Sequence, residues 1–504
     1  MWRDAFTSLF YFMETKMENF LFRLSENSFV RFFGDYGYIV SQLTKHDYLY
    51  DKIGQVFLQY ISRDPQDFLE TSKKLHALFI DVSLEEVQKD FFEFIKNLES
   101  GKFVITGKSV EELDKNDFRF SYADENPKTF ALKFDNNETE KNLPSMSDVL
   151  FEEFHKQPRI FSLQFELTSC CNERCIHCYI PHEWKNETLD KETVFKVLDQ
   201  AAAMGTLGIT LSGGEALLHP DFIEILRYAR KKDFMITILS NLTLLNDEIV
   251  QAIKECNVSL IQTSLYSMDA VEHDFITTAP GSFEKTKKGI ETLIANDIPV
   301  QISCPVMKKN LHSYKNVMKW AYEHKIKSQS DFIMMAQSDF NTQNLNNRIS
   351  VSETEELIRD IIKVDCDYQR MLDEEPKKRT PQEEEKEKLK PKCGAGTDSI
   401  CIAANGNFYP CPGWQNMVVG NIKEKNLKDI WENSEQLKFI RSITNGSFPK
   451  CLKCEAKDYC AMCMVRNFNE SNGDVFKVNQ HFCDVAFLTK KLAEEYRNNK
   501  KHEK

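Results

Sequence analysis

Residues 160–179 read IFSLQFELTSCCNERCIHCY, and this stretch decides the fold of the chain. It begins with an apolar run typical of a buried strand. Three cysteines with the spacing Cys171-x3-Cys175-x2-Cys178 follow directly after the run. The active sites of parallel α/β barrels lie at the carboxyl ends of their strands. We therefore expect three thiols at the place where such a barrel would carry out its chemistry.

Strand-like and helix-like segments alternate from this stretch as far as residue 340. The expected strands are Ile160–Leu167, Gly208–Leu211, Met235–Leu239, Ser259–Leu265, Val300–Pro305 and Phe332–Ala336. The expected helices are Lys191–Met204, Pro220–Lys231, Asn246–Glu255, Ser282–Asn296 and His312–His324. Strands that alternate with helices of this length predict a parallel sheet, and six such units predict a partial (β/α)6 TIM-type barrel of the α/β class.

The 15 cysteines of this 504-residue chain are strongly clustered. Four lie between positions 170 and 178 and eight between 393 and 483, whereas Cys256, Cys304 and Cys366 stand alone and are expected to be buried structural thiols. The N-terminus lacks a secretory signal pattern and no segment is apolar enough to span a membrane, so we expect a cytoplasmic protein. Clustered cysteines in that compartment indicate a zinc, copper(I) or iron–sulfur site. A formal net charge of −12 disfavours nucleic acid as a partner.

The segment Leu167–Tyr179 resembles the C-x3-C-x-aromatic-C signature of the radical S-adenosylmethionine (SAM) superfamily, with His177 in the aromatic position. A second motif of that family, GGE, is matched by residues 213–215 at the end of the second expected strand. A 4Fe–4S cluster with three thiolate ligands leaves one iron free to bind a cofactor. The resemblance implies that Cys171, Cys175 and Cys178 hold such a cluster.

The same resemblance implies which residues contact SAM and what reaction follows. The implied contacts are His177, Gly213, Gly214, Glu215, Ser240 and Ser264. The Glu215 carboxylate would accept hydrogen bonds from the amino group of SAM. One electron, from a donor such as flavodoxin or ferredoxin, would cleave SAM to methionine and a 5′-deoxyadenosyl radical. That radical would abstract hydrogen from an unactivated carbon.

The second group of cysteines, over residues 392–485, resembles the SPASM extension of radical SAM enzymes, which binds two auxiliary 4Fe–4S clusters and so brings the expected number to three. The resemblance implies that Cys451, Cys454, Cys460 and Cys483 hold the outer cluster, and that Cys393, Cys411 and Cys463 hold the inner one. Cys401 is a further candidate for the inner cluster. If Cys401 is not a ligand, one iron of the inner cluster would keep an open coordination position, which a substrate thiolate could occupy. A zinc ribbon could instead use Cys451, Cys454, Cys460 and Cys463, but it would leave Cys393, Cys411 and Cys483 without a role.

Residues 28–107 resemble the PqqD-like recognition element of ribosomal-peptide maturation enzymes. Two expected strands within Ser28–Leu43 are followed by three helices, the last of which starts at a capping box of Ser83 and Glu86 and ends at Gly101. The resemblance implies a winged-helix-like α+β domain whose strand edge takes up the leader of a precursor peptide. A small helical domain of another kind remains an alternative.

The order of these parts resembles a peptide maturase. The expected parts are a recognition domain (1–110), a linker (111–157), a radical SAM core (158–340), a bridging helix with a charged linker (341–391), a SPASM domain (392–485) and a C-terminal helix (486–504). Thioether formation between a cysteine sulfur and a carbon of the precursor is the leading reaction. Carbon–carbon cross-linking, epimerisation and a non-catalytic iron–sulfur scaffold stay open. A sulfatase-maturing enzyme is less favoured, because Pro412 stands where that group carries an Asp. No residue is assigned as catalytic acid or base.

Overall fold

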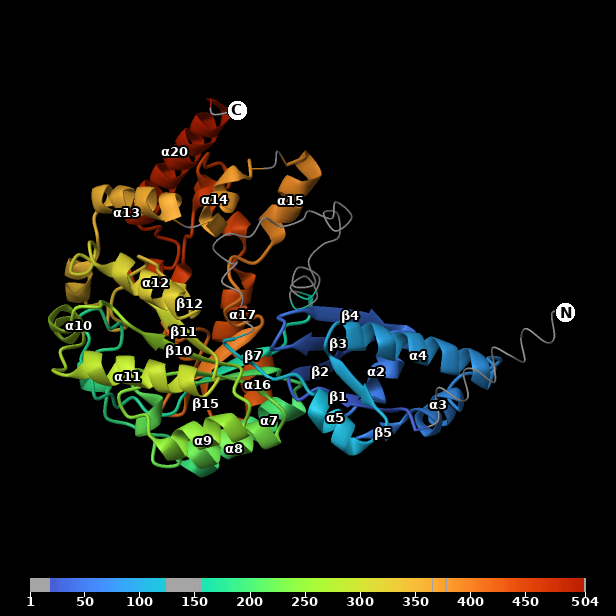
Figure 1. Ribbon diagram of the computed structural model, residues 1–504. Helices are drawn as coiled ribbons and strands as arrows, with labels where there is room; N and C mark the ends of the chain where they lie inside the picture. Colours follow the sequence, from blue (N-terminus) through green and yellow to red (C-terminus); the bar gives the residue numbers. More distant parts are fainter. Residues whose placement is uncertain are drawn as a thin grey trace. The chain divides into compact units, whose positions relative to one another are not determined.

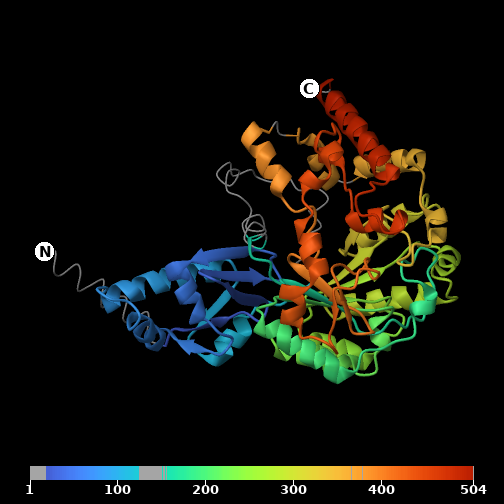
Figure 2. The same ribbon diagram turned by 180° about the vertical axis from the view of Figure 1, so that it is seen from behind.

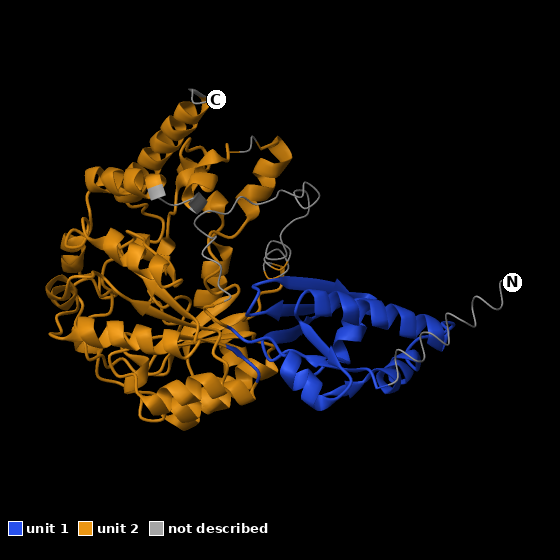
Figure 3. Ribbon diagram, in the orientation of Figure 1, with its two compact units in different colours: residues 1–120, 233–235 blue, residues 121–232, 236–504 orange. Residues whose placement is uncertain are grey.

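The computed structural model describes residues 19–123, 156–364, 366–376 and 379–502, together with Leu150 and Phe154. The chain divides into two compact units, residues 1–120 with 233–235 and residues 121–232 with 236–504 (Figure 3). Among the described residues, no helix combines the length and the apolar character that crossing a bilayer requires.

The N-terminal unit contains two small antiparallel sheets. One has the strand order β2-β3-β4, and the other has the order β5-β1-β6. Its strands are β1 (Leu21–Leu24), β2 (Ser28–Phe33), β3 (Tyr36–Ser41), β4 (Asp47–Asp51), β5 (Gln66–Asp67) and β6 (Val104–Gly107). Its helices are α2 (Lys52–Gln59), α3 (Phe68–His76), α4 (Leu84–Ser100) and α5 (Val110–Asn116). The predicted strand pair is thus present as β2 and β3, and β4 is an edge strand of their sheet.

Helix α4 confirms the start and end signals in the sequence. The Ser83 hydroxyl accepts from the Glu86 N–H and the Glu86 carboxylate accepts from the Ser83 N–H, which completes the capping box, and Gly101 caps the other end. Its apolar stripe, with Phe91 and Ile95 at its centre, is fully buried. The Phe91 ring stacks on Phe68 of α3, with ring centroids 5.6 Å apart, so α4 is the central helix of this unit's core.

The C-terminal unit is built on one nine-stranded sheet, in which the six strands β7 to β12 follow one another in chain order (Figure 1). These strands are β7 (Ser162–Glu166), β8 (Gly208–Ser212), β9 (Met235–Leu239), β10 (Leu260–Ser264), β11 (Val300–Ser303) and β12 (Lys327–Gln329). The connecting helices are α7 (Lys191–Ala203), α8 (Phe222–Lys231), α9 (Asp247–Glu255), α10 (Ala270–Thr277), α11 (Ser282–Ala295) and α12 (Tyr314–Glu323). The predicted α/β class with a partial barrel is confirmed.

The two faces of the barrel sheet differ in polarity. Leu163, Phe165 and Leu211 alternate along β7 and β8 and are fully buried, as residues on the helix-covered side of such a sheet must be. The intervening side chains are polar, and Gln164 Nε2 donates to Ser212 Oγ over 2.8 Å. The inner side of the barrel is therefore lined by groups that can bind a polar cofactor or substrate.

The last predicted strand, Phe332–Ala336, is wrong. The sixth strand is the more polar β12, which pairs with β11 at the edge of the sheet. An edge strand needs no continuous apolar run, because only one of its sides pairs with a neighbour. The apolar run instead forms an irregular connection in which Met334 is buried against Tyr266 and Met307.

The cysteine-rich region continues the same sheet. Strand β13 (Ser399–Ile402) pairs in parallel with β7, and it is followed by β14 (Asn407–Tyr409) and β15 (Gly420–Asn421). The remaining helices are α13 (Val351–Val364), α14 (Cys366–Asp373), α15 (Pro381–Leu389), α16 (Leu427–Asn433), α17 (Glu435–Ser442), α18 (Pro449–Leu452), α19 (Met464–Glu470) and α20 (Gln480–His502). Helix α20 lies against α13 and α14 (Figure 2). Backbone pairing thus joins the barrel and the cysteine-rich region directly.

Candidate active site

Two loops at the carboxyl ends of β7 and β8 are held tightly together. The Gly214 N–H donates to the Thr168 carbonyl over 2.7 Å, and the Glu215 N–H donates to the Cys170 carbonyl over 2.9 Å. A Cβ on Gly213 would lie 2.3 Å from the Thr168 oxygen, and one on Gly214 would lie equally close to the Cys170 oxygen. Only glycine allows this approach, so the GGE loop directly supports the first cysteine loop.

Glu215 and Ser240, both predicted to contact SAM, contact each other. The Glu215 carboxylate accepts from Ser240 Oγ over 2.7 Å and from the Asn241 N–H over 2.7 Å, and it is fully buried. Burial raises the pKa of Glu215, whereas these hydrogen bonds oppose the rise. A buried carboxylate at this position suits the recognition of a cation such as an amino group.

His177 and Ser264, the other predicted SAM contacts, meet at Tyr266. The Tyr266 hydroxyl lies 3.3 Å from His177 Nε2 and hydrogen-bonds with Ser264. Burial lowers the pKa of His177 to about 4, so its ring is neutral near pH 7. Its Nδ1 is buried without a partner among the described residues, which leaves a polar atom available to a bound group. Tyr266 was not predicted, although it stands only two residues beyond Ser264.

The three thiols of the first loop are close enough to influence one another. Burial raises the pKa of Cys175 well above its usual value, and Glu173, Cys178 and Cys171 raise it further. Burial likewise raises the pKa of Cys171 to about 11. Converging thiols that resist ionisation suit a cationic centre, which would draw off their protons. No group of three or more Cys, His, Asp or Glu within the described ranges is arranged as a site for a single metal ion.

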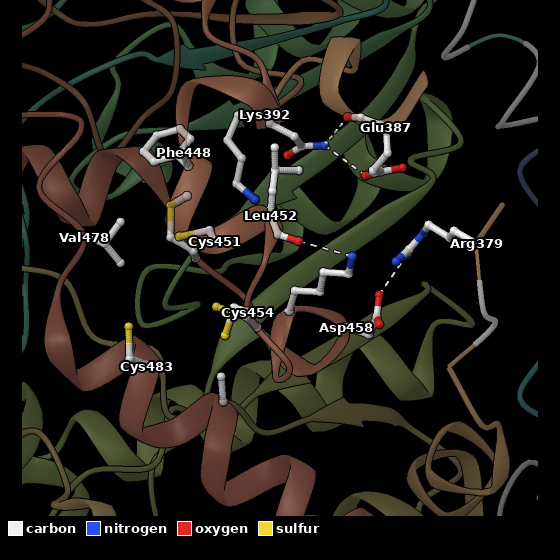
Figure 4. Close-up of a pocket in the computed structure, with 15 residues that line it drawn as sticks. Arg379, Glu387, Lys392, Phe448, Cys451, Leu452, Cys454, Asp458, Val478 and Cys483 are labelled. Carbon is white, nitrogen blue, oxygen red and sulfur yellow. Dashed lines mark hydrogen bonds and ion pairs between the residues drawn. The ribbon is translucent and has the colours of Figure 1, made fainter. Parts of the chain in front are cut away.

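A second set of thiols lines one pocket, where Figure 4 shows Cys451, Cys454 and Cys483. Cys460 lines the same pocket and completes the predicted outer set. Burial raises the pKa of Cys451, and Cys460 and Cys454 act in the same direction, whereas the Lys392 ammonium opposes them. Four thiols from α18, the loop beyond it and α20 therefore meet at one place, which fits a cluster with four thiolate ligands.

The predicted inner set also comes together. Burial raises the pKa of Cys411 to about 12, and Cys463 and Cys393 add to the rise. Cys401 differs from these three thiols, because it is fully buried in β13, in register with Gln164 of β7 and Tyr409 of β14. The titratable groups that act on it are Glu166 first and then Cys411. The structure thus brings three thiols together and leaves Cys401 beside them, within a strand.

Sequence reasoning also missed Glu166, a buried carboxyl at the end of β7. It accepts a hydrogen bond of 2.6 Å from Gln415 Nε2, in the loop that follows Cys411. Burial raises the pKa of Glu166 to about 8. The only signal in the sequence was a charged residue inside an otherwise uncharged strand. The remaining isolated cysteines, Cys256 and Cys304, are buried, whereas the side chain of Cys366 lies outside the described part of the structure.

Two family descriptions match this chain. Residues 165–321 match the radical SAM superfamily, and residues 393–464 match the SPASM iron–sulfur cluster-binding domain. The matches contain the first cysteine loop with the GGE loop and most of the second group of cysteines. A radical SAM domain and a SPASM domain imply 4Fe–4S clusters and SAM as cofactors.

Individual relatives differ in the biosynthetic role that their names give. An AdoMet-dependent heme synthase of Methanosarcina barkeri is 29% identical over 333 residues, which cover 62% of this chain and 92% of the relative. The antilisterial bacteriocin subtilosin biosynthesis protein AlbA of Bacillus subtilis is 27% identical over 312 residues, which cover 61% of this chain and 68% of AlbA. Among solved structures, SuiB of Streptococcus suis bound to its precursor peptide SuiA has the same fold, with a TM-score of 0.57 and 17% identity over 89% of this chain and 97% of SuiB.

Proposed function

We propose that this chain, with its radical SAM and SPASM domains, modifies a ribosomally synthesised precursor peptide and forms thioether cross-links on it. The observation that carries the proposal is the extent of the likeness to SuiB, which was solved with its precursor peptide. That likeness leaves out about a tenth of this chain, which is less than the N-terminal unit, so the shared fold includes part of that unit.

The cysteine geometry supports one assignment of ligands. In the proposal, Cys171, Cys175 and Cys178 hold the SAM cluster, Cys393, Cys411 and Cys463 hold the inner auxiliary cluster, and Cys451, Cys454, Cys460 and Cys483 hold the outer one. Glu215 would receive the amino group of SAM, with His177, Ser240 and Ser264 around it. A cluster held by the first three thiolates would supply the electron that splits SAM into methionine and a 5′-deoxyadenosyl radical.

The N-terminal unit would bind the leader of the precursor. Strand β4 is an edge of its sheet, so its outer side can add a further strand through backbone hydrogen bonds. Tyr50 of this strand packs on Phe94 of α4, with ring centroids 4.9 Å apart, and Tyr48 is 38% exposed. An extended leader along β4 would therefore have both a backbone partner and an aromatic side chain to contact.

The product follows from the balance of atoms. The deoxyadenosyl radical takes one hydrogen atom from a carbon of the peptide, and the cysteine thiol gives up a proton. The new carbon–sulfur bond then releases one electron, which must leave to a one-electron acceptor protein. The product should weigh two hydrogens less than the precursor, and its joined cysteine should resist alkylation.

The test uses the anaerobically reconstituted full chain with SAM, dithionite and short Cys-containing peptides encoded by neighbouring open reading frames. Formation of 5′-deoxyadenosine tests the radical SAM part, and Cys175→Ala should abolish it. Peptide mass and alkylation test the thioether. A mass loss with every cysteine still alkylatable would favour carbon–carbon cross-linking, and an unchanged mass would favour epimerisation. Tyr48→Asp should weaken leader binding, whereas Leu78→Asp, at a comparably exposed apolar residue outside β4, should not.

Tetrapyrrole modification is the second candidate, favoured by the heme synthase of M. barkeri. That match covers 62% of this chain, so more than a third of the chain has no counterpart in the heme synthase. An iron porphyrin offered in place of the peptide distinguishes the two. If it is converted in a SAM-dependent reaction while no peptide is modified, the peptide proposal is wrong and the radical SAM assignment stands.

A further inference from the structure

Helix α19 carries a guanidinium that is buried without a hydrogen-bond partner. Arg466 is 3% exposed, and its Nε and Nη2 donate to no group in the part of the chain that the structure describes. Its Cζ lies 3.7 Å from the centre of the Phe482 ring, which covers one face of the guanidinium. The N–H groups point outward in the plane of the guanidinium, so the ring does not satisfy them. A buried cation with unpaired donors indicates that an accepting or anionic group belongs beside it.

One carboxylate is close to Arg466, and it is already engaged elsewhere. Glu470 Oε1 lies 3.7 Å from Arg466 Nε, which is longer than a hydrogen bond. Both carboxylate oxygens of Glu470 accept from Arg348, over 3.0 Å at Oε2, and the Asn479 amide donates to the same carboxylate. Two buried guanidinium groups therefore share a single carboxylate.

The other titratable groups around Arg466 do not balance this charge. Burial lowers the pKa of His481, so its ring is neutral near pH 7, and Asp484 beside it is exposed to solvent. Asp331 interacts electrostatically with Arg466 without forming an ion pair within the described ranges, and burial raises the pKa of its carboxyl. Burial lowers the pKa of Arg466 to about 10, which still leaves it positively charged near pH 7. Within ion-pair distance, two cations thus face one anion.

Cys463 places this cation beside the inner set of thiols. Cys463 is the N-cap of α19 and Arg466 follows three residues later, so the two are neighbours on the first turn of the helix. After Glu470, Cys463 is the group that raises the pKa of Arg466. The same thiol acts on Cys411 and on Cys393. The excess positive charge therefore lies next to the three thiols of the inner set.

We propose that Arg466 is the counter-charge of the inner auxiliary cluster and raises the reduction potential of that cluster. The inference rests on the ligand assignment in the proposed function. A 4Fe–4S cluster held by thiolates is anionic, and it gains a further negative charge when one electron reduces it. A buried cation nearby stabilises the reduced form more than the oxidised form. The cluster would therefore take up more readily the electron that carbon–sulfur bond formation releases.

The test is a redox titration of the full-length reconstituted protein, followed by electron paramagnetic resonance. The triple variant Cys171→Ala/Cys175→Ala/Cys178→Ala lacks the SAM cluster, so only the auxiliary clusters titrate in it. Adding Cys411→Ala should remove the inner cluster, which identifies the signal that belongs to that cluster. The measurement needs no peptide, so it does not depend on which bond the enzyme forms.

Two variants in this background should shift the inner potential in opposite directions. Arg466→Gln should make reduction of the inner cluster at least about tenfold less favourable, which is about 59 mV for a one-electron step. Arg466→Lys, which keeps the positive charge, should restore most of that loss. Glu470→Gln should instead make the reduction more favourable, because it removes the carboxylate that offsets the two cations. Arg227→Gln, which replaces a surface arginine of α8 paired with Glu255, should change neither potential.

The opposite signs separate an electrostatic role from a structural one. The proposal is overturned if Arg466→Gln leaves the inner potential unchanged, if it shifts only the outer potential, or if Arg466→Gln and Glu470→Gln shift the inner potential in the same direction. Where Arg466→Gln binds too little iron to titrate, Glu470→Gln decides, and an inner potential that does not rise overturns the proposal. If Cys411→Ala removes no signal, the ligand assignment is wrong and this inference falls with it. If the potentials shift as expected but no peptide is modified, only the proposed function is wrong.

Discussion

Gly214 lies so close to Cys170 that a Cβ on it would come within 2.3 Å of the Cys170 carbonyl oxygen. The same carbonyl accepts the N–H of Glu215 over 2.9 Å. The loop that would bind the amino group of SAM and the loop that would bind the cluster are therefore one packed unit. A change in either loop should disturb both functions.

Gly214→Ala should prevent assembly of the SAM cluster. The new methyl group meets the backbone of two consecutive residues, since the Ser169 carbonyl oxygen is also only 2.4 Å away, and backbone cannot rotate aside as a side chain can. We expect SAM cleavage to fall by at least about tenfold, equivalent to about 1.4 kcal/mol. Iron content and 5′-deoxyadenosine formation measure the effect. Gly208→Ala is the control, because a Cβ there meets its nearest atom at 3.7 Å; an equal loss in both variants would contradict the prediction.

Glu166→Gln should make the protein more stable at high pH. Burial raises the pKa of Glu166 to about 8, so folding favours its neutral form. The contribution of Glu166 to the free energy of unfolding is fully present below its unfolded-state pKa of about 4.3. It decreases by about 1.4 kcal/mol per pH unit as the pH rises from there to the folded-state pKa of about 8. Glutamine, which does not ionise, avoids this loss and can still bond to Gln415.

Unfolding curves at pH 5, 7 and 9 measure the difference between Glu166→Gln and the wild type. That difference should grow in favour of the variant from pH 5 to pH 8 and then level off. Glu435→Gln, at a carboxylate that is 81% exposed, should show no such trend. A difference that stays constant with pH would mean that Glu166 is ionised in the folded protein throughout.

The sequence was most informative where local chemistry alone determines the structure. The capping box of Ser83 and Glu86 needs only residues within one turn, and it formed as predicted. The parallel barrel was predictable because its strands other than β12 are rich in apolar residues and alternate with amphipathic helices. The three cysteines could be placed at the end of β7 because their spacing continues directly from that strand.

Contacts between segments that are far apart in the chain could not be predicted from the local sequence. Strand β13 joins β7 although more than 200 residues separate them, and its short run SICI carries no signal of its partner. The polar β12 was missed because edge strands lack an apolar pattern. The bond between Gln415 and Glu166 likewise depends on how two remote loops meet.

Cys454→Ala should separate SAM cleavage from cross-linking. Cys454 shares its pocket with Cys451, Cys460 and Cys483, remote in sequence from the first cysteine loop. Its loss should remove the iron of the outer cluster while the GGE loop and its partner loop stay intact. We expect 5′-deoxyadenosine to form with dithionite, and the peptide to lose no hydrogens. Lys453→Ala is the neighbouring control; full cross-linking by the Cys454 variant would show that the outer thiols are not needed.

Cys401→Ala should leave the iron content unchanged, whereas Cys411→Ala should lower it. Cys401 is held in β13 by pairing on both sides, so its strand cannot shift toward the inner thiols without breaking the sheet. Its first titratable neighbour is Glu166, whereas the first titratable neighbours of Cys411 are Cys463 and Cys393. Iron analysis and electron paramagnetic resonance of the reduced proteins compare the two variants. Unchanged spectra for Cys401→Ala would leave the inner iron with a position for a substrate thiolate, as thioether formation requires. If that variant instead lost the iron of one cluster, Cys401 would be the fourth ligand of the inner cluster. No position there would then be open to a substrate thiolate, and the main reason for preferring a thioether over a carbon–carbon bond would be gone.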